Sequence, residues 1–203
     1  MKMDFINTSN RNFGSIPLYR AVLKQRKLFG QARPIEAIVS LAEKTDLDRL
    51  DLNPQRWILT EFGYDVIQDM ERMSPSYAKQ NYDGGLLVEI PSKKPGKQVK
   101  AMASFSTNSD DVCVNVLQTK REILPFNRTK GAGSLIMYAI SKIAQEKHCP
   151  KISLFSAPGS TGFYKKMGFK RNPGRFFDLS SSKFEDFQRR LEEKFQIKEI
   201  AKA

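Results

Sequence analysis

The segment PFNRTKGAG, residues 125–133, combines positive charge with glycines directly before an apolar stretch of helical period. The first turn of a helix leaves about four backbone N–H groups unpaired, and the helix dipole makes that end positive. Arg128 and Lys130 add cationic side chains there. Gly131 and Gly133 allow the backbone to approach a bulky anion closely. The segment therefore has the features of a pyrophosphate site, although a glycine-bearing turn that only caps a helix would look the same.

The sequence lacks the motifs of other nucleotide-binding, zinc-binding and triad sites. Segment 125–133 lacks the Gly-Lys-Ser/Thr of a P-loop, and a Rossmann motif requires three glycines early in the chain. The one histidine, His148, and the two cysteines, Cys113 and Cys149, complete neither a zinc pattern nor a histidine-dependent triad. We therefore expect no metal. His148 is predicted to lie at a helix end, and Cys113 is predicted to be a small buried side chain on a strand.

A second motif, FYKKMGF at residues 163–169, follows the first after one helix and one strand. The loop R-x-x-G-x-G at 128–133 resembles the Q/R-x-x-G-x-G/A cofactor loop of the GNAT acyltransferase superfamily, and residues 163–169 resemble its FYxxxGF element. Pro125, three residues before the arginine, is also usual in that family. The resemblance covers about residues 84–180. It implies an α/β fold in which helices flank a mixed, mostly antiparallel central sheet.

The resemblance implies acetyl-CoA as cosubstrate. In this family it lies in a cleft where two parallel strands part, here the strand that ends near Leu124 and the strand at 151–155. Backbone groups of Ile123 and Leu124 would pair with the pantetheine arm, and N–H groups of residues 128–134 would hold the pyrophosphate. The cofactor-binding residues implied in this way are Ile123, Leu124, Arg128, Thr129, Lys130, Gly131, Ala132, Gly133, Ser134, Ser156, Ser160 and Lys165.

Tyr164 matches the family's general acid, which protonates the leaving thiolate. A tyrosine with an ordinary pKa near ~10 holds its proton at neutral pH and can donate it; alternatively, its ring only packs between helix and sheet. The reaction implied is direct transfer of an acetyl group to a primary amine, helped by positioning and oxyanion donors. Glu122, the only carboxylate on the preceding strand, is the candidate base, or else a solvent-facing residue. Asn115 or Gln118 would act instead through ordered water.

Two features depart from the family pattern. Many relatives carry Asn and then Ala before the tyrosine, whereas this chain has SAPGST at 156–161. Ser156 or Ser160 would then replace the asparagine contact to the pantetheine. The polar tract QTKRE at 118–122 is predicted to form a bulge in its strand.

The elements that would position these residues follow from the hydrophobic period. A period of two predicts strands over 86–90, 99–105 and 112–116, which short turns join into an antiparallel meander. The elements expected after the meander are a helix at 131–147, a strand at 151–155, a helix at 161–167 and a strand at 175–179. Residues 84–180 would together form the GNAT core.

The flanking regions are expected to be helical. Residues 1–16 are polar and should form a loose N-terminal segment. Apolar residues at three- and four-residue steps predict two helices within 17–52, split at Gly30 and Pro34. A further helix is expected over 54–73 and a loop over 74–83. Residues 17–83 would thus supply extra N-terminal helices, the substrate side of the fold.

Residues 181–203 are expected to form a C-terminal amphipathic helix, capped by Ser181 or Ser182. Its apolar stripe consists of Phe184, Phe187, Leu191 and Phe195. The stripe would pack on the chain's own sheet or against a second copy, which would make a homodimer.

Charge and composition restrict the partners. The chain has 203 residues with 34 Lys+Arg against 22 Asp+Glu, a net charge of +12. Such an excess favours polyanions: nucleic acid, a membrane surface or a phosphate-bearing cofactor. Four lysines, Lys93, Lys94, Lys97 and Lys100, are expected on an exposed hairpin. With neither a signal peptide nor a membrane span in the sequence, we expect a soluble, cytoplasmic protein.

Two functions from different classes fit these observations. The first is an acetyl-CoA-dependent N-acetyltransferase whose acceptor is an amine on a small molecule or a protein. The alternative is a catalytically idle GNAT-fold basic module that binds nucleic acid or ribonucleoprotein. The absence of an RNP-type motif or zinc finger weighs against the second, and the joint presence of the 128–133 loop and Tyr164 favours the first.

Overall fold

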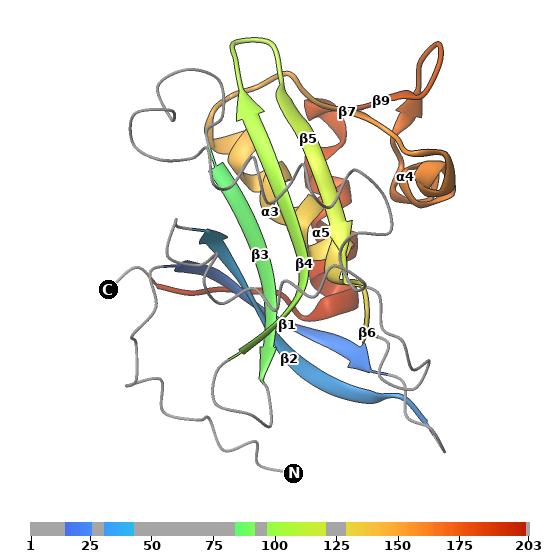
Figure 1. The fold of residues 1–203 in the computed structure, drawn as a ribbon. Coiled ribbons are helices and arrows are strands. Elements are labelled where there is room, and N and C mark those ends of the chain that lie inside the picture. Colours follow the sequence, from blue (N-terminus) through green and yellow to red (C-terminus); the bar gives the residue numbers. More distant parts are fainter. Residues whose placement is uncertain (1–14, 26–30, 43–83, 92–96, 121–128, 202–203) are drawn as a thin grey trace.

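The computed structural model describes residues 15–25, 31–42, 84–91, 97–120 and 129–201 (Figure 1). These residues form one mixed sheet with the strand order β10-β1-β2-β3-β4-β5-β7-β9-β8, and β6 pairs with β1. Among the described strands, only β5 and β7 run parallel, and every other pair is antiparallel. The strands are β1 Ile16–Gln25, β2 Arg33–Ala42, β3 Gly84–Pro91, β4 Lys97–Thr107, β5 Val112–Thr119, β6 Thr129–Lys130, β7 Lys151–Phe155, β8 Lys170–Arg171, β9 Phe176–Ser180 and β10 Lys198–Glu199. The mixed, mostly antiparallel α/β architecture expected from the sequence is confirmed.

The described helices are α3 Ala132–Glu146, α4 Thr161–Met167 and α5 Phe184–Phe195, with short 3₁₀ turns at Pro158–Ser160 and Ser181–Lys183. Two of them, α3 and α4, lie where the sequence predicts them, whereas the helix expected over 181–203 is shorter. It begins at Phe184 without a cap from Ser181 or Ser182 and ends at Phe195, and Lys198–Glu199 form a strand instead. Glycine and proline mark the ends of the other two: α4 stops at Gly168, which has a φ of 94°, and Pro150 follows the end of α3. No described helix has the length and apolar character that crossing a bilayer requires.

The prediction of helices within 17–52 is wrong for the described residues. Residues 16–25 and 33–42 form β1 and β2, paired from Ile16↔Leu41 to Gln25↔Arg33. On β1 the buried residues are Tyr19, Ala21 and Leu23, a period of two that belongs to a strand. The four-residue steps that suggested a helix are even numbers and therefore fit either period. The helix expected at 54–73 and the loop at 74–83 lie outside the described residues.

The helices α3 and α5 pack together on one face of the sheet (Figure 1). The Tyr138 hydroxyl donates a hydrogen bond to Glu192 Oε1 on α5 at 2.7 Å, and the Tyr138 ring contacts Tyr19 of β1 edge to face at 5.2 Å. The apolar stripe of α5 is buried in the chain's own core. It is therefore used within the chain, the first of the two arrangements expected for it.

Gly131 is fixed by packing as well as by backbone conformation. Its φ of 103° is left-handed, which favours glycine. A Cβ added there would lie 2.5 Å from Phe195 Cε1 and 3.1 Å from Leu23 Cδ2. The start of α3 thus packs against the end of α5 and the C-terminal part of β1.

We predict that Gly131→Ala lowers the free energy of unfolding by about 2–4 kcal/mol, from left-handed strain and overpacking against Phe195. Urea unfolding measures this change. Gly162→Ala is the matched control, because a Cβ there meets nothing within 4 Å. Adding Phe195→Leu to Gly131→Ala should recover part of the loss. Equal stability of the two glycine variants would contradict the packing assignment.

Candidate functional site

The two parallel strands pair over a short stretch only, and we call the place where their pairing ends the wedge. The β5–β7 pairing runs only from Val112↔Ile152 to Val114↔Leu154, whereas β5 continues to Thr119 along β4. Beyond Val114, the β7 side of β5 therefore has no strand partner among the described residues. Figure 1 shows β5 running on past β7, with α4 to one side.

A β-bulge lies where the strands part. On β4 the consecutive residues Ser104 and Phe105 face Val116 and Val114, so Asn115 is the extra residue. A bulge bends its strand and re-aims side chains, which accounts for the parting directly after Val114. The bulge predicted within 118–122 is absent at 118 and 119, where the pairing is regular, and residues 121 and 122 lie outside the described ranges.

The first turn of α3 meets the wedge. A Cβ at Gly133 would lie 3.3 Å from Thr119 Cγ2, 3.5 Å from Leu117 Cδ2 and 3.5 Å from Phe163 Cζ. The helix start therefore abuts both the end of β5 and α4. Glycine permits this close approach, because a larger side chain would push α3 away from β5.

The start of α3 offers hydrogen-bond donors. No side chain caps the helix, and its first turn carries no acidic residue. The first intrahelical bond runs from Leu135 N to Gly131 O at 3.1 Å, so the N–H groups of residues 132–134 precede the ladder. The buried Thr129 Oγ1 beside them has no hydrogen-bond partner in the described part of the chain. These groups suit an anion.

Two lysines face each other beside this helix start. Lys24 of β1 lies directly opposite Lys130 of β6, and both are exposed. Neither has a carboxylate partner among the residues that the structure describes. Like charges directly opposite each other are destabilising, and an anion bound there would offset the repulsion. The sequence indicated Lys130 but not Lys24, because only the strand register brings Lys24 to this place.

Tyr164 lies on α4 in an aromatic cluster. Its side chain is 6% exposed. The ring centroids of Phe163, Phe169 and Phe177 lie 5.0, 5.8 and 5.8 Å from its own. Burial raises the pKa of Tyr164 to about 12. The phenol therefore holds its proton firmly at neutral pH.

Comparison with known proteins decides the fold. No protein-family model matches the chain, and no curated protein matches it. Three solved structures are similar in fold. AtaTR bound with AcCoA is 12% identical, with 73% of this chain and 96% of that chain covered and a TM-score of 0.53. The KacTA–DNA complex is 11% identical, with coverages of 73% and 96% and a TM-score of 0.52, and a mutant of KacT is 8% identical, with coverages of 74% and 98% and a TM-score of 0.53. These neighbours are GNAT acetyltransferases. The chain has the GNAT fold. The GNAT-like fold expected from the two motifs is confirmed.

The other predicted residues are spread around this GNAT fold. Ser156 is fully buried, and its hydroxyl bonds to Ala157 O at 2.9 Å. Ser160 lies at the start of α4 without capping it, and Lys165 is exposed on the same helix. Four predicted site residues, Glu122, Ile123, Leu124 and Arg128, lie outside the described residues.

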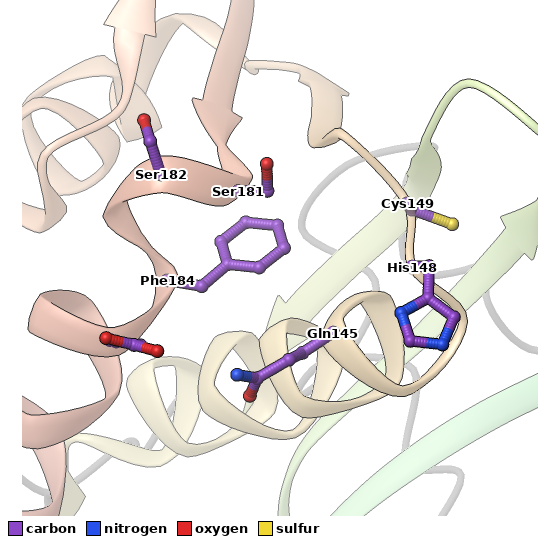
Figure 2. A pocket seen from close by; sticks show the side chains of 7 residues that line it. Gln145, His148, Cys149, Ser181, Ser182 and Phe184 are labelled. Atoms are coloured by element: carbon purple, nitrogen blue, oxygen red, sulfur yellow. The ribbon is translucent and has the colours of Figure 1, made fainter.

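His148 and Cys149 lie far from the wedge, whereas Cys113 lies on β5 and is half-buried, not fully buried as predicted. A hollow of about 460 Å³ at the C-terminal end of α3 is lined in part by His148, Cys149 and Phe184 (Figure 2). Since α3 has 15 residues, this hollow is roughly 22 Å from the helix start. Burial raises the pKa of the Cys113 thiol, which disfavours the reactive thiolate. Within the described residues, no three His, Cys, Asp or Glu side chains gather as metal ligands.

Lysine placement departs from one expectation. Lys100, predicted on an exposed hairpin, is 3% exposed. It is the extra residue of a second bulge, because Val88 faces Ala101 while Glu89 faces Val99. Lys97 lies on β4, and Lys93 and Lys94 lie outside the described residues.

The burial of Tyr164 predicts a pH effect on stability. Its folded pKa of about 12 exceeds the ordinary ~10, so the native state keeps this proton where the unfolded chain loses it. The free energy of unfolding should therefore fall as pH rises from about 10 towards 12, by up to about 3 kcal/mol from this residue. Urea unfolding along an alkaline series measures this, and Tyr164→Phe should flatten the dependence. A Tyr164 that ionises near its ordinary pKa, seen by ultraviolet absorbance, would contradict the desolvated environment.

Proposed function

We propose that this protein is an acetyl-CoA-dependent N-acetyltransferase that acylates a primary amine. The observation that supports it is the β5–β7 wedge with the uncapped start of α3 at its edge, in a GNAT fold. AtaTR, a structural neighbour, is described bound with AcCoA. The acceptor is an amine-bearing small molecule or protein.

The donors at the helix start fit a diphosphate. The amides of Ala132, Gly133 and Ser134 would bind its oxygens, with help from Thr129 and from the flexible backbone of Gly131. Lys24 and Lys130 would offset its charge, together with Arg128 and Lys165. Because residues 129–130 pair with β1, most of the amide donors proposed for the diphosphate lie in α3 itself.

The open edge of β5 fits an extended arm. Backbone groups of residues 115–119 on the β7 side would pair with the pantetheine amides as another strand does. Ile123 and Leu124 would continue this edge, and Ser156 and Ser160 would contribute from the α4 side. Acetyl-CoA supplies the activated acyl group, and the chain positions it against the amine.

Tyr164 is proposed as the general acid. A C–N bond forms as the C–S bond breaks; the amine loses a proton and the thiolate gains the phenolic one. A pKa of about 12 means that Tyr164 enters every cycle protonated at neutral pH. Glu122 is the proposed base. Asn115 stands as the water-mediated alternative: its Oδ1 accepts from Ser106 Oγ at 3.4 Å, and its Nδ2 has no partner within the described residues.

Acetyl-CoA binding is tested first, by thermal shift. At one hundred times its Kd a ligand adds about 2.7 kcal/mol of stability, so the melting temperature should rise. The Lys24→Ala/Lys130→Ala double variant should show a smaller shift because it lacks the cations beside α3. Lys198→Ala, on β10, should match the wild type. If millimolar acetyl-CoA produces no shift, the chain is a catalytically idle module.

Turnover is tested with Tyr164→Phe, which keeps the ring and removes the proton. Loss of a general acid should lower kcat about 100-fold or more, with KM for acetyl-CoA little changed, in a CoA-thiol release assay over an amine and peptide panel. Structural neighbours include a KacT mutant and an AtaT mutant in which one tyrosine is replaced by phenylalanine. Tyr138→Phe is the control for loss of another phenol: it removes the bond to Glu192, so it should lower stability and should lower kcat far less than Tyr164→Phe does. If turnover is unchanged in Tyr164→Phe, Tyr164 is not the general acid and its side chain only packs in the core.

A further inference from the structure

Two exposed aromatic rings lie side by side at the edge of the wedge. Phe155 ends β7 and faces Phe176 at the start of β9; they are 47% and 56% exposed. Their ring centroids are 5.1 Å apart at an interplanar angle of 65°. Their strand neighbours Leu154 and Phe177 are buried. The alternation of strand side chains therefore places both rings on the sheet face that the core does not use.

An arginine completes this aromatic pair. The Arg175 guanidinium carbon lies 4.7 Å from the Phe155 ring centroid. Phe155 thus contacts both Arg175 and Phe176, and Phe176 remains the more exposed ring. An exposed aromatic face beside a guanidinium is the arrangement on which an unpaired nucleobase stacks.

A basic hollow continues along the same strands. Its volume is about 340 Å³, and its lining includes Lys151, Lys170 and Lys183. Across the strands, Lys170 lies opposite Asp178 and Lys151 opposite Ser180. Residues 176, 178 and 180 share one face of β9, so the hollow begins within roughly 13 Å of the rings.

The positive charge of this hollow is largely uncompensated. Asp178 is its one acidic residue, and it already accepts a hydrogen bond from Asn172 Nδ2 at 2.5 Å. In the described part of the chain no carboxylate pairs with its lysines. Between residues 147 and 183 the chain carries one acidic residue and eight basic ones: Lys147, Lys151, Lys165, Lys166, Lys170, Arg171, Arg175 and Lys183.

From these observations we propose that the exposed face of β7, β9 and β8 binds an unpaired strand of nucleic acid. A base stacks on Phe176, and the strand's phosphates lie along the lysine-lined hollow. An acidic peptide would contact the lysines but not the phenylalanine rings, whereas a nucleotide contacts both. A duplex would offer phosphates but no free base face. The hollow includes Pro150 and Lys151 at the beginning of β7, whereas the wedge opens at the other end of that strand, so binding there does not require acetyl transfer.

The test is fluorescence anisotropy of the full chain with labelled oligo(dT) and oligo(rU) of about ten nucleotides, a length within the usual range of single-strand sites. Phe176→Ala should weaken binding about 5- to 150-fold, the range measured for loss of a stacked base. Phe176→Tyr keeps the ring and should bind like the wild type. Ile16→Ala, which truncates another exposed apolar side chain, is the matched control and should have no effect.

The phosphate part of the surface has its own readout. Lys170→Ala/Lys183→Ala should weaken binding and reduce the slope of log K against log salt by about 1.4, at about 0.7 for each phosphate contact on a single strand, whereas Lys198→Ala should not. Saturating acetyl-CoA should leave oligonucleotide binding intact. Displacement by acetyl-CoA, equal loss in Phe176→Ala and Ile16→Ala, or tighter binding of a duplex than of either single strand would each overturn the proposal. A chain that fails to bind acetyl-CoA but shows the Phe176 effect would disprove only the transferase.

Discussion

The parting of β5 from β7 leaves backbone groups that need partners. Three residue pairs join these parallel strands, and the bulge at Asn115 then turns β5 away while its other edge stays bonded to β4. Buried N–H and C=O groups are nearly always paired, and an unpaired one costs free energy. Within the described residues, the fold therefore presents a strand edge without a strand partner, which water or an extended ligand would satisfy. The start of α3 lies at the same place, so hydrogen-bond donors for an anion and a strand-like edge for a chain of amides occur together.

The position of α3 depends on elements distant in sequence. Gly131 packs against Phe195 of α5 and Leu23 of β1, and Tyr138 connects α3 to Glu192 and Tyr19. A change in the C-terminal helix would therefore move the helix start relative to the wedge. Gly131 has two reasons to be glycine: its left-handed φ and this contact. From the sequence, Gly131 was expected only to let the backbone approach an anion. The structure shows that Gly131 also packs against the ring of Phe195.

Local signals explain which parts of the fold were predictable. The elements α3, β7 and α4 are bounded by glycine or proline and carry a clear period, and their bounds match within one residue. Between residues 17 and 42 the signal was ambiguous, because steps of four fit a strand as well as a helix. Lys24 could not be placed at the site at all, since its meeting with Lys130 depends on the pairing of β1 with β6. Tyr164 was found from its motif, but its aromatic surroundings include Phe177, which belongs to a strand that comes later in the chain.

Charge is spread over more of the molecule than a cofactor site explains. Lys24 and Lys130 are the described basic residues that the register places at the start of α3, and they suit a single diphosphate. The eight basic residues between 147 and 183 include several on the other side of the wedge, next to the exposed Phe155–Phe176 pair. Like charges held close together destabilise a folded chain, and two phenylalanines that are about half exposed gain only part of the free energy of full burial. Both costs fall on the same face, and a ligand with anionic groups and flat apolar rings would offset both.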